Sequence, residues 1–246
     1  MTRVAVCLPT YNEAENVGLM IDALVAVFAE HEINGHILVI DDSSPDGTAA
    51  IAAERGRDDP RISVLRRVRK EGLGNAYRDG FRRVLGDGAE VVVQMDCDFS
   101  HDPAVIPSLL AALDDADVAL GSRYVRGGGV IGWPLVRQAI SKGGCLYARV
   151  VLGVHVRDLT GGFKAWRSGV LEYLLGRSID AKGYGFQVQM TYEAILAGYR
   201  PKEIPIIFRD RVRGKSKMHF GVVTEAAFMV PRLRLAALRE RHDVLK

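Results

Sequence analysis

Two aspartates separated by one residue end the most strand-like stretch of the sequence, VVVQMDCDFSHDP (residues 91–103). Carboxylates such as those of Asp96 and Asp98 are ligands that Mg²⁺ and Mn²⁺ prefer, and these cations keep positions for water and phosphate oxygens. If the segment is extended, both side chains face the same way and can bind a cation that a diphosphate shares. Two aspartates could equally end a strand and cap a helix that begins at Pro103. The pattern alone leaves both interpretations open.

A second acidic cluster, DDSSPDGT (residues 41–48), follows another apolar run. Its later residues form a good turn, and Asp46 or Thr48 could cap the next helix. Asp41 and Asp42 are harder to explain as turn residues, and a carboxylate at a strand end can accept hydrogen bonds from a base or a ribose hydroxyl. Neither Gly-x-Gly-x-x-Gly after the first strand nor Gly-Lys-Ser/Thr occurs, so any phosphates must be held by metal and side chains.

Basic residues are concentrated late in the chain, in FRDRVRGKSK (residues 208–217). Such a run could be an ordinary solvated surface, or it could surround a diphosphate leaving group. Arg123 and Arg137 flank a glycine-rich loop at 123–134 and are further candidates for anion binding. Their alternative interpretation is that of ordinary surface arginines.

The elements that must position these clusters alternate between short apolar runs and helical periodicities. Strands are predicted at 3–9, 36–41, 62–67, 90–96 and 117–122, and helices at 15–30, 47–55, 74–86 and 102–115. This alternation predicts an α/β fold with a Rossmann-like, doubly wound, mostly parallel sheet, in which ligands bind at the carboxyl ends of the strands. The polar clusters follow the first, second and fourth strands. Beyond the glycine-rich loop we expect helices at 134–152 and 186–197, a strand at 202–210 and a final helical stretch at 220–241, without a linker that separates two domains.

Composition bounds the function class. The 246 residues carry a formal charge of +3 and three cysteines without Cys-x-x-Cys spacing. The charge is too small to imply nucleic acid, and the cysteines are expected to be reduced core residues of a cytoplasmic protein. The amino terminus does not resemble a signal peptide, and no apolar run is long enough for a membrane span, so any membrane contact is expected at the surface.

Taken in order, the clusters resemble a family-2 glycosyltransferase of the GT-A fold, specifically of the polyprenol-phosphate (dolichol-phosphate type) mannosyltransferases. The resemblance covers the chain from Val4 to about Met218. It rests on nine motifs: PTYNEAENV, VIDDSSPDGT, GLGNAYRDGF, MDCDFSHDP, GSRY, GWPLVRQAISKGG, VRDLTGGFKAWR, KGYGFQVQM and FRDRVRGKSKM.

The resemblance assigns roles to individual residues. The catalytic residues would be Asp98, Arg211 and Lys217. The nucleotide-sugar site would comprise Pro9, Tyr11, Glu13, Ile40, Asp42, Asp96, Cys97, Lys182, Arg211, Ser216 and Lys217. The acceptor phosphate would be held by Arg123, Arg137 and Ser141, and the metal by Asp96, Asp98 and Ser100. Some relatives carry glutamine where this chain has Ser100, so a weaker or water-mediated contact is expected there.

The implied reaction transfers mannose from GDP-mannose to a polyprenyl monophosphate, with inversion to a β-linked product and with Mg²⁺ or Mn²⁺ as cofactor. A phosphate acceptor is already an anion at neutral pH, so no strong general base is needed. Asp158 is the candidate base if the acceptor is a hydroxyl, and we expect it instead to order the acceptor loop. The alternatives are a polyprenyl-phosphate glucosyltransferase that uses UDP-glucose, a transferase to a sugar hydroxyl, and a non-catalytic nucleotide-sugar-binding subunit.

The lipid acceptor raises the question of the membrane. Residues 1–218 are expected to form the catalytic domain, and 219–246 an amphipathic helical segment that Pro231 kinks or splits. Its apolar and arginine side chains could lie on an anionic membrane surface, or the segment could pack on the domain as a helix pair. The loop with Val130, Ile131 and Trp133 is a second candidate for lipid contact. The expected location is therefore peripheral, on the cytoplasmic face of the membrane. A membrane-protein partner is left open, and the sequence does not identify it.

Overall fold

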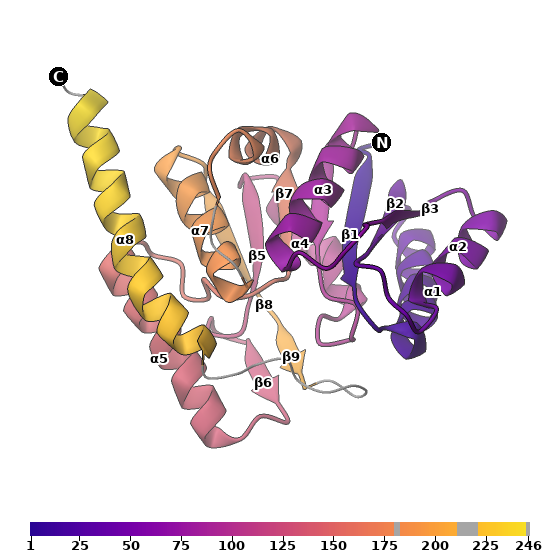
Figure 1. Cartoon of the computed structure of the whole chain (residues 1–246), viewed down its shortest axis with the longest axis horizontal. Coiled ribbons are helices and arrows are strands. Elements are labelled where there is room, and N and C mark those ends of the chain that lie inside the picture. Colours follow the sequence, from indigo (N-terminus) through magenta and orange to yellow (C-terminus); the bar gives the residue numbers. More distant parts are fainter. Residues whose placement is uncertain (180–182, 211–220, 245–246) are drawn as a thin grey trace.

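A seven-stranded sheet forms the centre of the molecule in this computed structural model, which describes residues 1–179, 183–210 and 221–244 (Figure 1). Its strand order is β3-β2-β1-β4-β7-β5-β8. The strands are β1 (Val4–Thr10), β2 (Gly35–Asp41), β3 (Ile62–Arg66), β4 (Val91–Gln94), β5 (Val118–Ser122), β7 (Lys164–Arg167) and β8 (Pro201–Pro205). All neighbours are parallel except β7, which is antiparallel to both β4 and β5. The predicted mostly parallel sheet is confirmed.

Helices cover both faces of this sheet. They are α1 (Ala14–Glu30), α2 (Thr48–Asp58), α3 (Leu73–Gly86), α4 (Ile106–Ala112), α5 (Leu135–Leu152), α6 (Ser168–Leu175), α7 (Gly183–Leu196) and α8 (Gly221–Val244), with a short 3₁₀ helix η1 (Pro103–Val105). Side chains alternate along β1, as the pleat of a strand requires. Val4, Val6 and Leu8 pack in one core with α1, α2 and α4, whereas Ala5 and Cys7 pack in the other with α3, α6 and α7.

The region around 201–210 differs from the prediction of one strand. It forms β8 and β9 (Ile207–Arg209), and β9 pairs with β6 (Gly129–Ile131) in a separate two-stranded sheet. Ile206 joins the two sheets, because its N–H donates to Ser122 O and its carbonyl accepts from Gly129 N. The glycine-rich loop is therefore anchored to the main sheet through Ile206.

At one end of the molecule α5 and α8 pack side by side (Figure 1). Of the two effects expected of Pro231, a kink or a split, the split is wrong, because α8 continues through this residue. No helix in the described part of the chain combines the length and apolarity needed to cross a membrane. Cys7, Cys97 and Cys145 are all unpaired and buried, as predicted.

Candidate active site

The polar clusters that follow β1 and β2 are bound to each other at the carboxyl edge of the sheet. Thr10 Oγ1 donates to Asp41 Oδ1 at 3.1 Å. In the next residues, the backbone N–H of Asn12 donates to Ser44 Oγ at 3.0 Å, and that of Glu13 donates to Thr48 Oγ1 at 2.9 Å. These bonds fix the loop after β1 against the loop after β2. Within DDSSPDGT, Ser44 N donates to Asp41 Oδ2 at 2.9 Å and Thr48 N donates to Asp46 Oδ1 at 3.1 Å, so the predicted turn is present. The N-cap of α2 is Gly47, not Asp46 or Thr48.

Asp42 is buried and forms an ion pair with Arg67, which is also buried. Arg67 further contacts Asp79 at 2.8 Å and Glu71 at 3.2 Å. Burial raises the pKa of Asp42, and the hydrogen bond and charge of Arg67 oppose that shift. The carboxylate predicted to meet the nucleotide is therefore held in place by Arg67, an arginine that was not predicted to take part in the site.

The other residues predicted for the nucleotide after β1 and β2 differ in exposure. Pro9, Tyr11 and Glu13 are partly exposed, and Lys70 Nζ lies 3.8 Å from the centre of the Tyr11 ring. Ile40 has no exposed surface, and its side chain packs so closely on α3 that a Cβ at Gly80 would lie 2.2 Å from it. Ile40, predicted for the nucleotide site, therefore offers a nucleotide no accessible surface in this structure.

The loop after β4 brings Asp96 and Asp98 to the same edge in a bend rather than in an extended segment. Phe99 has a left-handed backbone with φ 60°, which turns the chain directly after the second aspartate. Asp98 Oδ1 accepts hydrogen bonds from Ser100 N at 3.1 Å and from Ser100 Oγ at 2.5 Å. The expectation of an extended Asp-x-Asp segment is wrong; turn geometry and Ser100 place the second carboxylate instead.

Cys97 points into the core and is 3% exposed. Burial raises its pKa well above the ordinary value, and the charges of Glu13 and Asp98 raise it further. The thiol is therefore protonated at neutral pH and is no thiolate metal ligand.

The predicted metal set contains hard oxygen ligands only: two carboxylates and the hydroxyl of Ser100. Within the described ranges, no group of three or more His, Cys, Asp or Glu side chains is placed to hold a metal ion. A cation bound by Asp96 and Asp98 would thus take its remaining ligands from water and substrate, as Mg²⁺ and Mn²⁺ do at diphosphates.

Arg123, predicted for the acceptor phosphate, is buried with Asp158. Its Nε donates to Asp158 Oδ2 and its Nη2 to Asp158 Oδ1, both at 2.7 Å, and its backbone N–H donates to Oδ2 at 3.0 Å. Gly161 N donates to the same carboxylate at 3.1 Å. Asp158 has no exposed surface, and although burial raises its pKa, the charge and hydrogen bonds of Arg123 lower it overall. These contacts tie the segment after β5 to the segment at 158–161. Because the carboxylate is buried, paired with Arg123 and lowered in pKa, it is unsuited to act as a base.

Arg137 and Ser141 lie one turn apart on α5. Arg137 Nη1 is 3.2 Å from Asp210 Oδ1, and its guanidinium lies 4.0 Å from the centre of the Trp133 ring. Ser141 Oγ accepts a hydrogen bond from Tyr124 Oη at 2.7 Å. Because Arg123 also lies 5.2 Å from the Tyr124 ring and 5.5 Å from Trp133, the three predicted acceptor residues share one cluster. Lys182, Arg211, Ser216 and Lys217 fall outside the described residues.

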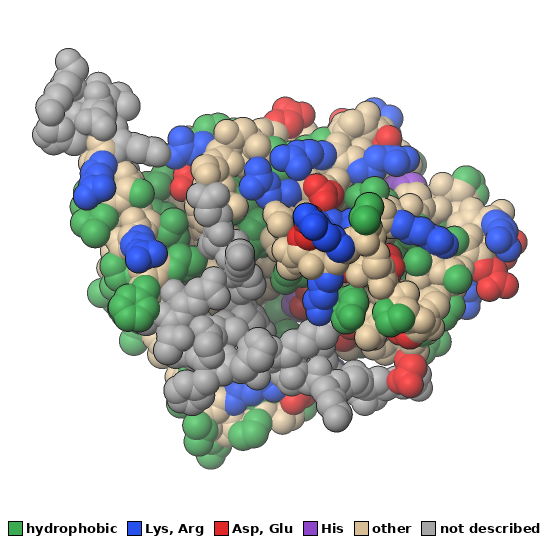
Figure 2. All heavy atoms as spheres, in the orientation of Figure 1, with side chains coloured by type: hydrophobic (Ala, Val, Ile, Leu, Met, Phe, Trp, Pro, Cys, Tyr) green, Lys and Arg blue, Asp and Glu red, His purple; other side chains and the backbone are tan. Residues whose placement is uncertain are grey.

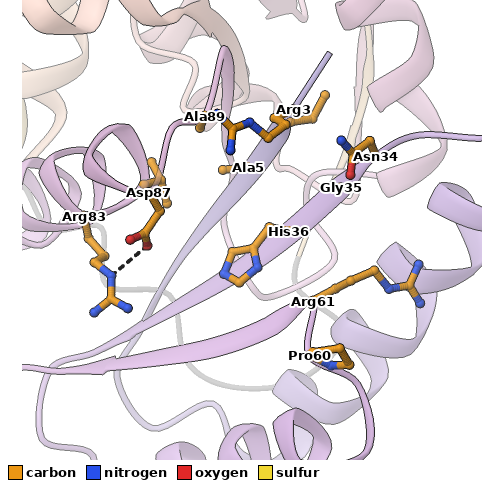
Figure 3. Close-up of a pocket in the computed structure, with 12 residues that line it drawn as sticks. Arg3, Ala5, Asn34, Gly35, His36, Pro60, Arg61, Arg83, Asp87 and Ala89 are labelled. Carbon is orange, nitrogen blue, oxygen red and sulfur yellow. Dashed lines mark hydrogen bonds and ion pairs between the residues drawn. The ribbon is translucent and has the colours of Figure 1, made fainter. Parts of the chain in front are cut away.

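A cavity of about 420 Å³ lies at the opposite, amino-terminal edge of the sheet (Figure 3). It is lined by the starts of β1 and β2 and by Arg61 and Arg83. Both arginines have carboxylate partners, Arg61 with Asp59 at 2.6 Å and Arg83 with Asp87 at 2.7 Å. Because its lining residues lie at the amino-terminal edge of the sheet, this cavity is separate from the carboxyl-edge site.

A buried polar network beneath the β4 end was missed by the sequence interpretation. Lys164 Nζ on β7 donates to Gln187 O at 3.0 Å, Gln187 Oε1 at 3.1 Å and Thr191 Oγ1 at 2.9 Å. Gln94 Nε2 donates to Gln187 Oε1 at 2.7 Å. Burial lowers the pKa of Lys164 to about 7, with a small opposing effect of Asp158. The motif FKAWR contained this lysine, but only its antiparallel pairing with β4 shows that it is internal.

Together, a mostly parallel sheet with helices on both faces and paired aspartates after β4 define the GT-A class of glycosyltransferase folds. The chain belongs to glycosyl transferase family 2, whose family model matches residues 5–175. It is 45% identical over 235 residues to an undecaprenyl-phosphate mannosyltransferase of Micrococcus luteus, covering 96% of this chain and 95% of that protein. It is also 45% identical over 230 residues to a polyprenol monophosphomannose synthase of Mycolicibacterium smegmatis, covering 93% and 85%.

Solved structures share the fold at low sequence identity. A mannosyl-3-phosphoglycerate synthase from Rubrobacter xylanophilus has a TM-score of 0.67 at 18% identity, covering 98% of this chain and 75% of that one. A mannosyltransferase from Pyrobaculum calidifontis, in complex with GDP-Man and Mn²⁺, has a TM-score of 0.62 at 17% identity, with the same coverage. A glucosyl-3-phosphoglycerate synthase from Mycobacterium tuberculosis, in complex with Mn²⁺, UDP and glucosyl-3-phosphoglycerate, has a TM-score of 0.65 at 19% identity, covering 98% of this chain and 80% of that one.

Proposed function

We propose that this protein transfers mannose from GDP-mannose to a polyprenyl monophosphate and releases GDP and a polyprenyl β-mannosyl phosphate. The observation that carries the proposal is the 45% identity, over 96% of the chain, to an undecaprenyl-phosphate mannosyltransferase. The positions of the charged clusters support it. Carboxylates for a metal diphosphate follow β4, and the arginines for a second phosphate follow β5 and begin α5.

On the donor side, Asp96 and Asp98 would hold Mg²⁺ or Mn²⁺ against the diphosphate. The fit rests on the donor set: two carboxylates at one bend, with Asp98 oriented by Ser100. The metal would offset the negative charge that develops on the departing GDP. Arg211 and Lys217, which lie outside the described residues, are proposed to assist this step.

On the acceptor side, Arg137 would bind the phosphate monoester with Ser141, while Arg123 is held by Asp158. A phosphate oxygen would form the new bond to C1 of mannose, as the bond from C1 to the β-phosphate of GDP breaks and its electrons leave with GDP. Attack opposite the leaving group inverts the anomeric centre. No proton needs to be removed from a phosphate oxygen that is already ionised, so the buried Asp158 is not required as a base.

A lipid acceptor must be met at a membrane, and α5 and α8 offer an apolar surface for it. Figure 2 shows hydrophobic side chains gathered over these helices, with basic ones among them on α8. The exposed apolar side chains on α5 are Leu135, Val136, Ile140, Leu146, Tyr147 and Val150. At 100° per residue these positions fall within about 140° of the helix circumference, opposite the buried residues of α5.

Phe228, Leu235 and Leu238 on α8 are also exposed, with Arg232 and Arg239 beside them. We propose that this α5–α8 surface binds the cytoplasmic face of an anionic membrane.

The test is a transfer assay with purified protein, Mg²⁺ or Mn²⁺, a polyprenyl phosphate, and either GDP-mannose or UDP-glucose. A mannosyl lipid formed only from GDP-mannose is the expected result. Product only from UDP-glucose would overturn the donor, transfer to a sugar hydroxyl without lipid would overturn the acceptor, and no transfer with nucleotide binding retained would favour a binding subunit.

The metal model is tested in the same assay with Asp98→Asn. We expect kcat to fall at least about a hundredfold, because stabilisation of the leaving group depends on this carboxylate. Asp102→Asn is the matched control in the same loop. Asp102 accepts from Ala104 N as a helix cap, and asparagine caps equally well. Unchanged turnover of Asp98→Asn in the presence of a chelator would exclude the metal model.

A further inference from the structure

His101 lies in the loop of the paired aspartates, buried at 2% exposure, and the sequence interpretation gave it no role. Its Nδ1 is 3.0 Å from the backbone nitrogen of Asp96. A backbone N–H can only donate, so Nδ1 must be the acceptor, and the neutral ring carries its proton on Nε2. The imidazole thus receives the N–H of the first aspartate of the pair.

The ring is held in this orientation by aromatic neighbours from two other segments. Phe163 stacks on it with 5.0 Å between centroids and 15° between planes. Phe208 of β9 meets it edge-on at 5.8 Å and 77°. The backbone of Gly162 passes alongside, because a Cβ there would lie 3.4 Å from His101 Cε1 and 3.8 Å from Asp96 Oδ1. These three contacts restrict the orientation of the imidazole ring.

The same loop fixes its two carboxylates by separate means. Ser100 donates hydrogen bonds to the side chain of Asp98, and the left-handed backbone of Phe99 makes the turn between Asp98 and Ser100. His101 accepts the hydrogen bond of the Asp96 backbone N–H and so fixes the position of the Asp96 Cα, from which the carboxylate extends. Asp96 lies beyond β4, which ends at Gln94, so strand pairing does not hold its backbone.

We propose that His101 is a positioning residue of the metal–diphosphate site, which holds the Asp96 backbone so that both aspartates reach one cation. The inference rests on the proposed function, because it takes Asp96 and Asp98 as the metal ligands. His101 acts through Asp96 and makes no contact with substrate in this role. Groups that orient metal ligands in this way commonly change metal affinity by ten- to a hundredfold.

Two substitutions separate the hydrogen bond from the packing. His101→Phe keeps an aromatic ring between Phe163 and Phe208 but leaves the Asp96 N–H without its acceptor. His101→Asn loses the ring but keeps an acceptor oxygen near the position of Nδ1. If His101 positions Asp96, then His101→Phe weakens Mn²⁺ binding about tenfold or more, whereas His101→Asn stays within a few-fold of the wild type. If the residue serves only packing, the order reverses.

The readout is Mn²⁺ affinity in the presence of GDP, from electron paramagnetic resonance of free Mn²⁺, with thermal unfolding to confirm that each variant folds. It requires no turnover, so it separates this inference from the proposed function. Weaker Mn²⁺ binding in His101→Phe supports the inference even if the wild type transfers no mannose. Wild-type affinity in His101→Phe overturns it even if transfer is confirmed, and a wild type that binds no Mn²⁺ with GDP overturns both the metal model and the inference.

Discussion

Arg137 is bound by Asp210, with 3.2 Å between Nη1 and Oδ1, while its guanidinium lies 4.0 Å from the centre of the Trp133 ring. The aromatic face fixes the plane of the arginine, and the carboxylate occupies the kind of position that a phosphate oxygen would take. The pair is partly exposed, so a ligand can compete for it.

Replacing Arg137 with methionine is therefore expected to raise KM for the polyprenyl phosphate about tenfold or more and to leave KM for GDP-mannose nearly unchanged. Methionine keeps much of the apolar stem but loses the charge. Lys142→Ala, an exposed cation on the same helix, is the control and should change neither value by more than about twofold in a soluble assay with a short-chain acceptor. Equal changes in both KM values would contradict the assignment.

Asp210→Asn should change KM for the acceptor in the direction opposite to Arg137→Met. Asparagine removes the negative charge that competes with the acceptor phosphate for Arg137, so KM for the acceptor is expected to fall a few-fold. Initial rates at varied acceptor concentration measure this. A higher KM would show that Asp210 helps the acceptor to bind rather than competing with it.

The buried pair Arg123–Asp158 predicts a stability effect. Asp158→Asn leaves the guanidinium of Arg123 without its counter-charge, and breaking a buried pair from one side costs about 3–5 kcal/mol in the free energy of unfolding. Urea denaturation measures this. The double variant Arg123→Met, Asp158→Leu should be less destabilised than the single variant, because no lone charge remains. The exposed pair Lys202–Asp115 is the control, and Asp115→Asn should leave the urea midpoint nearly unchanged.

Much of the fold could be predicted from the sequence, because its signals are local. The first five strands were expected from apolar runs, and their parallel order followed from the helices between them. Strand β7 was missed, because its four residues KAWR include a lysine and an arginine and do not resemble a buried strand. Lys164 is nevertheless internal, since Gln187 and Thr191 of α7 accept hydrogen bonds from its Nζ, and no local pattern reports a partner 23 residues away.

In the candidate site, too, features with a local sequence signal were predictable and long-range contacts were not. The acidic residues at strand ends were predictable, since the edge at which they meet follows from the parallel topology. Their partners were not predictable, because Arg67 reaches Asp42 from the residue after β3, and His101 reaches the backbone of Asp96 only through a turn at Phe99. The extended geometry expected for Asp96 to Asp98 was wrong for the same reason: a left-handed residue outside the glycines leaves little trace in sequence.

The internal Lys164 makes stability depend on pH in a defined direction. Its pKa falls from the ordinary 10.5 to about 7, so between these values the unfolded chain binds a proton that the folded chain does not. Stability should therefore rise with pH from about 7 to 10, by up to about 1.4 kcal/mol per pH unit, relative to Lys164→Met. The difference between the two unfolding curves across this range measures the effect and cancels other titrations. A constant difference would mean that the three acceptors around Nζ keep the ammonium form.

The proposed membrane surface predicts a defect that depends on the lipid. Val136→Glu with Val150→Glu places two carboxylates on the exposed apolar face of α5, where both side chains are about 70% exposed (71% and 69%) and no core contact is lost. Sedimentation with vesicles of anionic lipid should show binding reduced about tenfold or more, because apolar contact is lost and charge repulsion is added. Turnover with a long-chain acceptor in vesicles should fall in parallel, while turnover with a short, water-soluble acceptor stays near the wild type. Leu19→Glu is the control, since Leu19 is 51% exposed on α1 at the other end of the molecule. Equal vesicle binding by all three proteins would show that α5 does not face the membrane.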